Sequence, residues 1–279
     1  TIEKMTEATY NLMMPDYTNP MFGDTKLHDK SSLTRQFAAW GKVFPQNEQL
    51  KWFATDGKKG MKPAYDSYRL PDSGFYILRT GWDKEATVVI VKAGPPAFWH
   101  NQPDNGTFDY WRRGRNFFPD SGCYTYTTGS TRNKYAASTA HNTLTLDGKN
   151  VAGDGRMLHQ ESKSTSSFDY EVLVLENPSY ANLTHRRAVF MVADKFYVIL
   201  DEAYGSAEGT VNLNFNITEG TDAQVVLDPA KGGFHTAFSD GNNLLVRTAS
   251  DKAGGSFVKK TGFVSYQIDK SVERKAYQL

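Results

Sequence analysis

The sequence predicts a mainly β protein: a large antiparallel β-sandwich that follows a few helices. Before residue 65 the apolar residues recur at helical spacing, and from Phe75 onward they alternate with a period of two. The later segments are short, rich in β-branched and aromatic residues, and separated by Gly, Asp, Asn or Pro. Many strands at this spacing favour a sandwich of about a dozen strands over a parallel α/β sheet.

Three helices are expected in the first part of the chain, at residues 3–14, 31–41 and 47–53. Pro15 should end the first, because proline cannot continue a helix. Leu33, Phe37 and Trp40 lie on one face of the second, and Gly41 is a candidate stop. These pieces are too few to close a domain of their own, so we place a boundary between residues 1–64 and 65–279.

Strands are expected at eleven segments, namely 75–80, 86–92, 106–113, 143–147, 171–176, 187–193, 195–202, 210–217, 223–227, 244–249 and 262–267. Arg113-Gly114 and Asp194-Lys195 are predicted hairpin turns. Residues 162–167 are predicted as an exposed loop, and 274–279 as the opening of a further strand.

The composition excludes several classes of protein. The 32 basic residues nearly cancel the 31 acidic ones, so no overall field favours a nucleic acid or membrane partner. Cys123 is the only cysteine, which rules out an intrachain disulfide and a cysteine-based zinc module. No run of 18 apolar residues is present. The chain begins with Thr1, and we expect it to be a piece of a longer protein.

Polar chemistry is concentrated between residues 98 and 150. His100, Asp120 and His141 could meet as metal ligands on neighbouring strands, with an amide oxygen from Gln102. The alternative is equally ordinary: a hydrogen-bonded histidine in a sandwich, and an aspartate that caps a turn. The spacing leaves both interpretations open.

A second polar group combines guanidinium and aromatic side chains. Arg112, Arg113 and Arg115 lie beside Tyr110 and Trp111, a combination that suits a carboxylate or sulfate next to a sugar ring. Between residues 101 and 150, six Lys or Arg face four Asp. A solvated hairpin with alternating charges remains the alternative.

Three longer motifs resemble the heparinase II/III family of polysaccharide lyases, and most closely its heparinase III branch. They are His100-Asn-Gln-Pro-Asp-Asn-Gly-Thr-Phe, Gly114-Arg-Asn-Phe-Phe-Pro-Asp-Ser-Gly and His141-Asn-Thr-Leu-Thr-Leu-Asp. The segments that begin at Met21, Phe53 and Gly81 are similar to that branch too, so the likeness runs from about residue 10 to the end.

The resemblance implies an incomplete α/α toroid followed by an antiparallel β-sandwich, with the active site between them. Residues 1–64 would be the end of the toroid and 65–279 the sandwich. The implied reaction is β-elimination at a hexuronate, which gives a 4,5-unsaturated product. A toroid Tyr acts as base and acid in that family, and an Asn and a sandwich His assist. We expect the Tyr and Asn upstream of residue 1, so this chain alone should be inactive.

The resemblance also implies roles for particular residues. His100 matches the sandwich histidine, and we predict it to be catalytic. Gln102, Asp120 and His141 match the positions that hold a metal, so we expect one divalent ion, zinc or calcium, in a structural role; Gln102 stands where a stronger zinc ligand would be expected. The predicted substrate contacts are Asn101, Asn105, Trp111, Arg113, Arg115 and Tyr135.

The expected partners are an acidic polysaccharide or oligosaccharide, such as heparan sulfate, and the missing toroid domain, with no nucleic acid and no membrane. The resemblance implies a periplasmic location. Two alternatives stay open: a non-catalytic carbohydrate-binding or structural β-sandwich module, and a lyase for another uronate polymer such as alginate.

Overall fold

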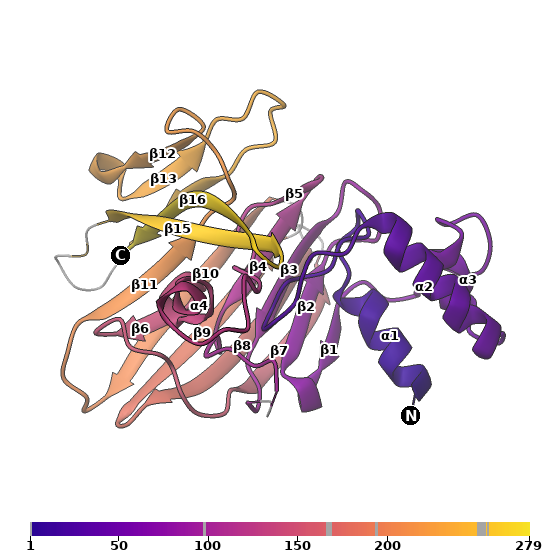
Figure 1. The fold of residues 1–279 in the computed structure, drawn as a ribbon, viewed down its shortest axis with the longest axis horizontal. Coiled ribbons are helices and arrows are strands. Elements are labelled where there is room, and N and C mark those ends of the chain that lie inside the picture. Colours follow the sequence, from indigo (N-terminus) through magenta and orange to yellow (C-terminus); the bar gives the residue numbers. More distant parts are fainter. Residues whose placement is uncertain (1, 97–98, 166–168, 193–194, 250–254, 256) are drawn as a thin grey trace.

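The computed structural model describes residues 2–96, 99–165, 169–192, 195–249, 255 and 257–279 (Figure 1). Its helices are α1 (Ile2–Leu12), α2 (Lys30–Val43), α3 (Glu48–Ala54) and α4 (Ser130–Ala136), with short 3₁₀ turns at Pro71–Ser73, Ser138–Ala140 and Pro229–Lys231. The first three helices lie at one end of the molecule, and α4 lies among the strands that make up most of the rest (Figure 1). The mainly β fold confirms the prediction.

The strands form four sheets whose ladders are all antiparallel within the described residues. Their orders are β1-β2-β3-β4-β5, β10-β9-β8-β7, β15-β16-β11-β6 and β12-β13-β14. The strands are β1 (Tyr68–Leu70), β2 (Phe75–Arg79), β3 (Thr87–Lys92), β4 (Phe108–Arg112), β5 (Arg115–Asn116), β6 (Leu144–Leu146), β7 (Arg156–Ser164), β8 (Asp169–Tyr180), β9 (Leu183–Val192), β10 (Phe196–Gly205), β11 (Val211–Asn216), β12 (Val225–Asp228), β13 (Gly233–Thr236), β14 (Leu245–Arg247), β15 (Val258–Gln267) and β16 (Lys270–Gln278).

The β1–β5 sheet is covered on both faces. One face carries Leu78, Val89 and Tyr110 into the main core, where they meet side chains of the β7–β10 sheet. The opposite face carries Ile77, Ile90 and Trp111, which pack against Met14 and Phe22 of the segment between α1 and α2. Burial on both faces explains why β3 is a continuous apolar run instead of an alternating one. The N-terminal segment is therefore part of the sandwich surface.

The helices begin and end close to where the sequence places them, with one correction. Asp29 caps α2 by accepting a hydrogen bond from the Ser32 amide at 2.7 Å, and Asn47 caps α3 at the Leu50 amide. Gly41 does not stop α2, which continues to Val43. The residue before Pro45 is disfavoured in the helical region, and this accounts for the later end.

The eleven predicted strands are present and β5 follows the predicted Arg113-Gly114 turn, but the sequence missed β1, β7, β13 and β16 and the helix α4. The predicted loop at 162–167 is wrong for residues 162–164, which continue β7; residues 166–168 lie outside the described part. Residues 274–278 form the end of β16 and not the opening of a strand. The turn at Arg113-Gly114 is confirmed, with φ of 48° and 84° at the two residues. Asp194 of the other predicted turn is not described.

Candidate functional site

His100 lies on the loop between β3 and β4, where a second loop clamps its backbone. Its φ is 56°, a left-handed conformation that is uncommon outside glycine. The His100 carbonyl accepts a hydrogen bond from the Asp24 amide at 3.1 Å. Gly23 makes this approach possible, because a Cβ at that position would lie 2.4 Å from the same carbonyl oxygen. The imidazole itself is open, with 66% of the side chain exposed.

Asp24 connects His100 to the surrounding elements. One carboxylate oxygen lies 3.6 Å from His100 Nδ1, although the carboxylate itself is only 5% exposed. Arg132 of α4 donates to both oxygens, at 2.7 and 2.9 Å. The amide of Gln102 donates to Asp24 Oδ1 at 3.1 Å. A carboxylate fixed by two donors in this way orients the imidazole next to it.

Tyr126 was not singled out from the sequence, yet its ring lies against His100. The two ring centroids are 5.6 Å apart in an edge-to-face arrangement, and Tyr126 is 55% exposed. Arg132 lies 5.9 Å from the Tyr126 ring centroid. An exposed imidazole, an exposed phenol and a fixed guanidinium therefore share one surface, a group that can bind and polarise a carboxylate-bearing ligand.

Beneath this surface lies a buried cluster of Asp104, Asp120 and His141. One candidate ligand atom from each side chain lies within 4.8 Å of the others. His141 Nδ1 is 2.9 Å from Asp120 Oδ2, and Lys92 donates to Asp104 at 2.5 Å. Asp104 was missed because an aspartate in a proline-containing turn is ordinarily a cap. The structure brings the predicted Asp120 and His141 together and adds Asp104 to them.

Three polar atoms of this region have no hydrogen-bond partner in the described part of the chain: Asp104 Oδ2, His141 Nε2 and Gln102 Oε1. Burial would lower the pKa of His141, but the charge and hydrogen bond of Asp120 outweigh it and raise the pKa. Burial raises the pKa of Asp104 despite the Lys92 ammonium. Buried polar atoms without partners are costly, so a cation that took up these donors would relieve them.

Three predicted substrate residues lie below the surface, so the structure gives no support to their role. The side-chain oxygen of Asn105 accepts from the Gly94 amide, and its NH₂ group donates to the Gly94 and Gly153 carbonyls. Trp111 is 1% exposed and packs in the cluster beneath Phe22. Tyr135 is 3% exposed, and its hydroxyl is 2.5 Å from Ser271 Oγ. Trp111 also lines the pocket that contains Arg115, and a substrate role for these three residues stays a prediction.

The other predicted substrate contacts, Asn101, Arg113 and Arg115, already contact charged side chains of the protein. Asn101 Oδ1 is 3.4 Å from the Lys92 ammonium. Arg113 is half exposed and lies 3.3 Å from Glu85. Arg115 forms a two-point pair with Asp240, donates to the Asn242 carbonyl and stacks on Phe238, so its charge is already balanced. These roles remain predictions.

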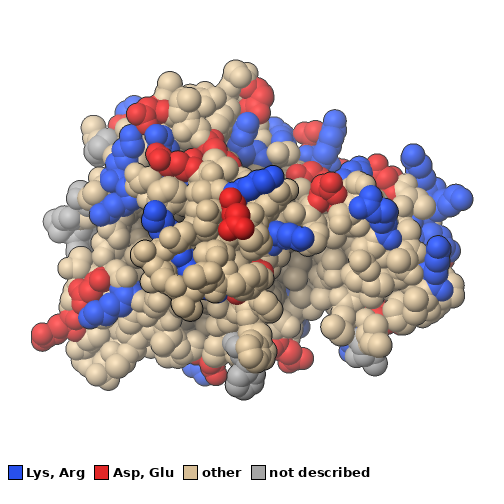
Figure 2. All heavy atoms as spheres, viewed as in Figure 1, with Lys and Arg blue, Asp and Glu red and all other residues tan. Residues whose placement is uncertain are grey.

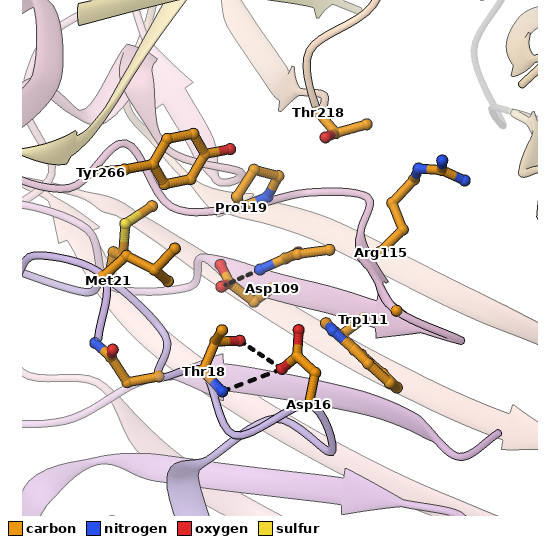
Figure 3. A pocket seen from close by; sticks show the side chains of 13 residues that line it. Asp16, Thr18, Met21, Asp109, Trp111, Arg115, Pro119, Thr218 and Tyr266 are labelled. Carbon is orange, nitrogen blue, oxygen red and sulfur yellow. Dashed lines mark hydrogen bonds between the residues drawn. The ribbon is translucent and has the colours of Figure 1, made fainter. Parts of the chain in front are cut away.

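Arg115 also lines a pocket of about 310 Å³ between the 16–27 segment and the outer face of the β1–β5 sheet (Figure 3). Asp109 faces this space, with one oxygen bound by Asn116 and the other without a partner among the described residues. Burial and the neighbouring Asp120 raise the pKa of Asp109 well above its ordinary value. The pocket thus combines two carboxyl groups, those of Asp16 and Asp109, with an arginine that is already paired with Asp240, and this combination does not suit an anionic ligand.

Two family models match the chain. The model described as "Heparinase II/III-like, C-terminal" matches residues 62–277, and "Heparinase II/III N-terminus" matches residues 1–52. Among curated proteins, the chain is 40% identical to a heparin-sulfate lyase of Pedobacter heparinus, over 99% of this chain and 42% of that protein. It is 40% identical to a heparin-sulfate lyase of Bacteroides thetaiotaomicron, over 95% and 39%.

The solved structures agree with this relationship. A heparinase III structure superposes with a TM-score of 0.93 at 40% identity, covering 100% of this chain and 43% of that one. A heparan sulfate lyase from Pedobacter heparinus superposes with a TM-score of 0.90 at 40% identity, covering 99% and 43%. The chain therefore spans about two fifths of the length of the relatives it matches.

Proposed function

The chain belongs to the heparinase II/III family, and from this premise we propose that it supplies the sandwich side of a lyase active site. The proposed substrate is a uronate-containing glycosaminoglycan such as heparan sulfate, cleaved by β-elimination. The observation that carries the proposal is His100: its backbone is clamped by Gly23 and Asp24, while its imidazole is exposed beside Tyr126 and Arg132.

The chemistry of β-elimination asks for such a group. The C5 proton of a hexuronate is very weakly acidic, so its removal needs donors that stabilise the charge developing on the carboxylate. The Asp24 carboxylate lies 3.6 Å from Nδ1 of His100 and so faces one side of an imidazole that is otherwise mostly exposed. We assign His100 to the uronate carboxylate or to proton transfer at the departing glycosidic oxygen.

The base is proposed to come from a region of the longer protein outside this chain. Tyr10 and Tyr17 are 3% and 5% exposed, and burial raises the pKa of both phenols. A buried phenol with a raised pKa is a poor proton acceptor. The length of the relatives supports this proposal, because the chain covers only about two fifths of them.

A substrate panel tests the proposal. The full-length protein is incubated with heparan sulfate, hyaluronan and alginate, and the ultraviolet absorbance of unsaturated product is followed. We expect product from heparan sulfate. Product from alginate alone would contradict heparan sulfate as the substrate and indicate a lyase for another uronate polymer. Binding without any product would favour a carbohydrate-binding module.

We also propose that Asp104, Asp120 and His141, with the amide oxygen of Gln102, hold one divalent metal ion, zinc or calcium. Carboxylate, amide and imidazole donors suit such ions, and the atoms without partners support the fit. The ion would supply positive charge that ties the 99–107 loop to the segments carrying Asp120 and His141.

Metal analysis and chelation test this structural role. We expect about one equivalent of metal in the purified protein, and a melting temperature that falls by several degrees when a chelator removes it. Chelation should not lower the melting temperature of the Asp120→Asn variant, because that variant should hold no metal. Metal-free protein with an unchanged melting temperature after chelation would contradict the proposal.

A periplasmic location is proposed from the family resemblance alone. In the part of the chain that the structure describes, no helix has both the length and the apolar character needed to cross a bilayer.

A further inference from the structure

A second pocket, of about 330 Å³, lies between α4 and the outer face of the β15-β16-β11-β6 sheet. Asn133 and Lys134 reach it from α4, and Asn216, Lys260 and Gln278 reach it from the sheet. Thr139 and Thr261 add hydroxyl groups, and Phe263 adds an aromatic ring. The volume lies at the small end of the range for ligand sites and is sufficient for a sugar unit.

The charged residues that line this pocket in the described part of the chain are both lysines. Lys134 and Lys260 are exposed, and neither ammonium has an ion-pair partner among the described residues. No Asp or Glu of the described part lines the space. Figure 2 shows both basic and acidic side chains over the region of β15 and β16, so the positive charge is confined to the pocket lining. Two unpaired cations beside amides and hydroxyls favour an anionic ligand that is also rich in hydroxyl groups.

The walls of the pocket are held in place by contacts beneath them. Tyr135 anchors α4 by stacking on Tyr124 with centroids 5.2 Å apart, and Lys134 extends over the Phe263 ring at 5.2 Å. Asn216 donates to the Thr139 and His141 carbonyls, which orients its amide.

Gly262 keeps the floor of the pocket open. A Cβ at this position would lie 3.1 Å from Asn216 Oδ1 and 3.1 Å from the Ala276 Cβ. The missing side chain leaves room for the Asn216 amide, which lies in the wall of the pocket and is itself only 1% exposed. The groups that a ligand can reach are the exposed Lys134, Lys260, Thr139 and Thr261 side chains, a combination that suits a sugar carrying an acidic group.

We infer that this pocket is a second saccharide site, which binds a sulfate- or carboxylate-bearing sugar unit apart from the His100 surface. The pocket lined by Asp109 and Arg115 does not compete for this role, because Asp16 adds negative charge and Asp240 balances the arginine. The inference goes beyond the lyase chemistry and shares with it only the class of ligand.

Equilibrium binding of a heparan sulfate tetrasaccharide to the purified chain tests the inference. Three proteins are compared: the unchanged chain, the double variant Lys134→Gln with Lys260→Gln, and Lys259→Gln. Lys259 is the matched control, since it lies on the same strand but pairs with Asp222 at 3.0 Å. All three changes are at exposed lysines, so folding should be unaffected.

We expect the double variant to bind at least tenfold more weakly and with a shallower dependence on salt, and Lys259→Gln to stay within twofold. The desulfated tetrasaccharide should bind weakly to all three. Equal affinity of the double variant and the unchanged chain would overturn the inference, as would an equal loss in Lys259→Gln. Neither result would touch the lyase proposal, which is tested by product formation.

Discussion

Two residues with positive φ hold the candidate site together. His100 adopts φ of 56° and Gly23 adopts φ of 70°, and their backbones meet at the His100 carbonyl. A histidine in this region costs on the order of 1 kcal/mol or more, and it persists only where the surroundings enforce it. The hydrogen bond from the Asp24 amide provides that enforcement. The exposed imidazole therefore projects from a backbone position that is held by hydrogen bonding and close packing.

The close contact between Gly23 and the His100 carbonyl predicts how much one added methyl group at residue 23 lowers the free energy of unfolding. Gly23→Ala should destabilise the chain by at least about 2 kcal/mol, because it adds a clash with the His100 carbonyl to the strain of a positive φ. Gly114→Ala is the control, since its φ is 84° but no atom lies within 4 Å of an added Cβ. It should cost only about 1 kcal/mol. Urea unfolding measures both, and equal costs would argue against the clamp.

Some residues of the candidate site could be predicted from the sequence, and others could not. The His100 motif pointed to the imidazole, and Asp120 and His141 do meet. Asp24 and Arg132 could not be predicted as their neighbours, because no short-range pattern tells which distant segments will contact one another. The aromatic and amide residues were harder still: the same side chain serves a ligand when exposed and a core when buried, and only tertiary packing decides.

At the scale of elements, the pairing of β9 with β10 supports the region beneath the site. Arg187 and Asp201 are direct cross-strand partners, and their side chains pair at 2.7 Å. Arg187 also donates to the carbonyls of Gly106 and Asn142. His185 Nε2 donates to Asp201 at 2.7 Å. One buried network therefore joins the β7–β10 sheet to the end of the His100 loop and to the residue after His141.

Breaking this network should be costly. Asp201→Asn leaves the buried Arg187 charge unpaired, and we expect a loss of about 3 to 5 kcal/mol in the free energy of unfolding at neutral pH. Glu202→Gln on the same strand is the control and should change stability by no more than about 0.5 kcal/mol, since that side chain is half exposed. Chemical denaturation distinguishes the two, and similar stabilities would contradict the account.

The same pair sets a dependence on pH. Burial would raise the pKa of Asp201, but Arg187 and His185 outweigh it and lower the pKa. A carboxyl with a lowered pKa stabilises the fold fully above its unfolded value of about 3.9, and this contribution is lost as the pH falls further. Acid should therefore destabilise the unchanged chain more steeply below about pH 4 than it destabilises Asp201→Asn.

Elements with strong local signals were predicted, and those without were missed. Capping residues and apolar spacing identify α2 and α3. The strand β16 carries mainly charged residues along its first half, which is exposed, so alternation is absent there. It forms because β15 and β11 supply partners on both sides. Strand formation depends on such neighbours more than on intrinsic preference.

At the scale of the whole molecule, we propose that this chain forms one side of an active site whose other side comes from the rest of a longer protein. The purified chain should give no ultraviolet-absorbing product from heparan sulfate, because we propose that the base lies outside the chain. Covering two fifths of the relatives is the observation behind this expectation. Robust product formation by the chain alone would place the base within it, and Tyr126 beside His100 would then be the first residue to change.

The exposed, clamped imidazole of His100 is the centre of the account, and turnover by its alanine variant in the full-length protein tests it most directly. With His100→Ala, formation of unsaturated product from heparan sulfate should be abolished, while affinity for the oligosaccharide stays within about tenfold, or ~1.4 kcal/mol. Undiminished turnover would contradict the assignment and leave a sandwich that binds sugar without taking part in its cleavage.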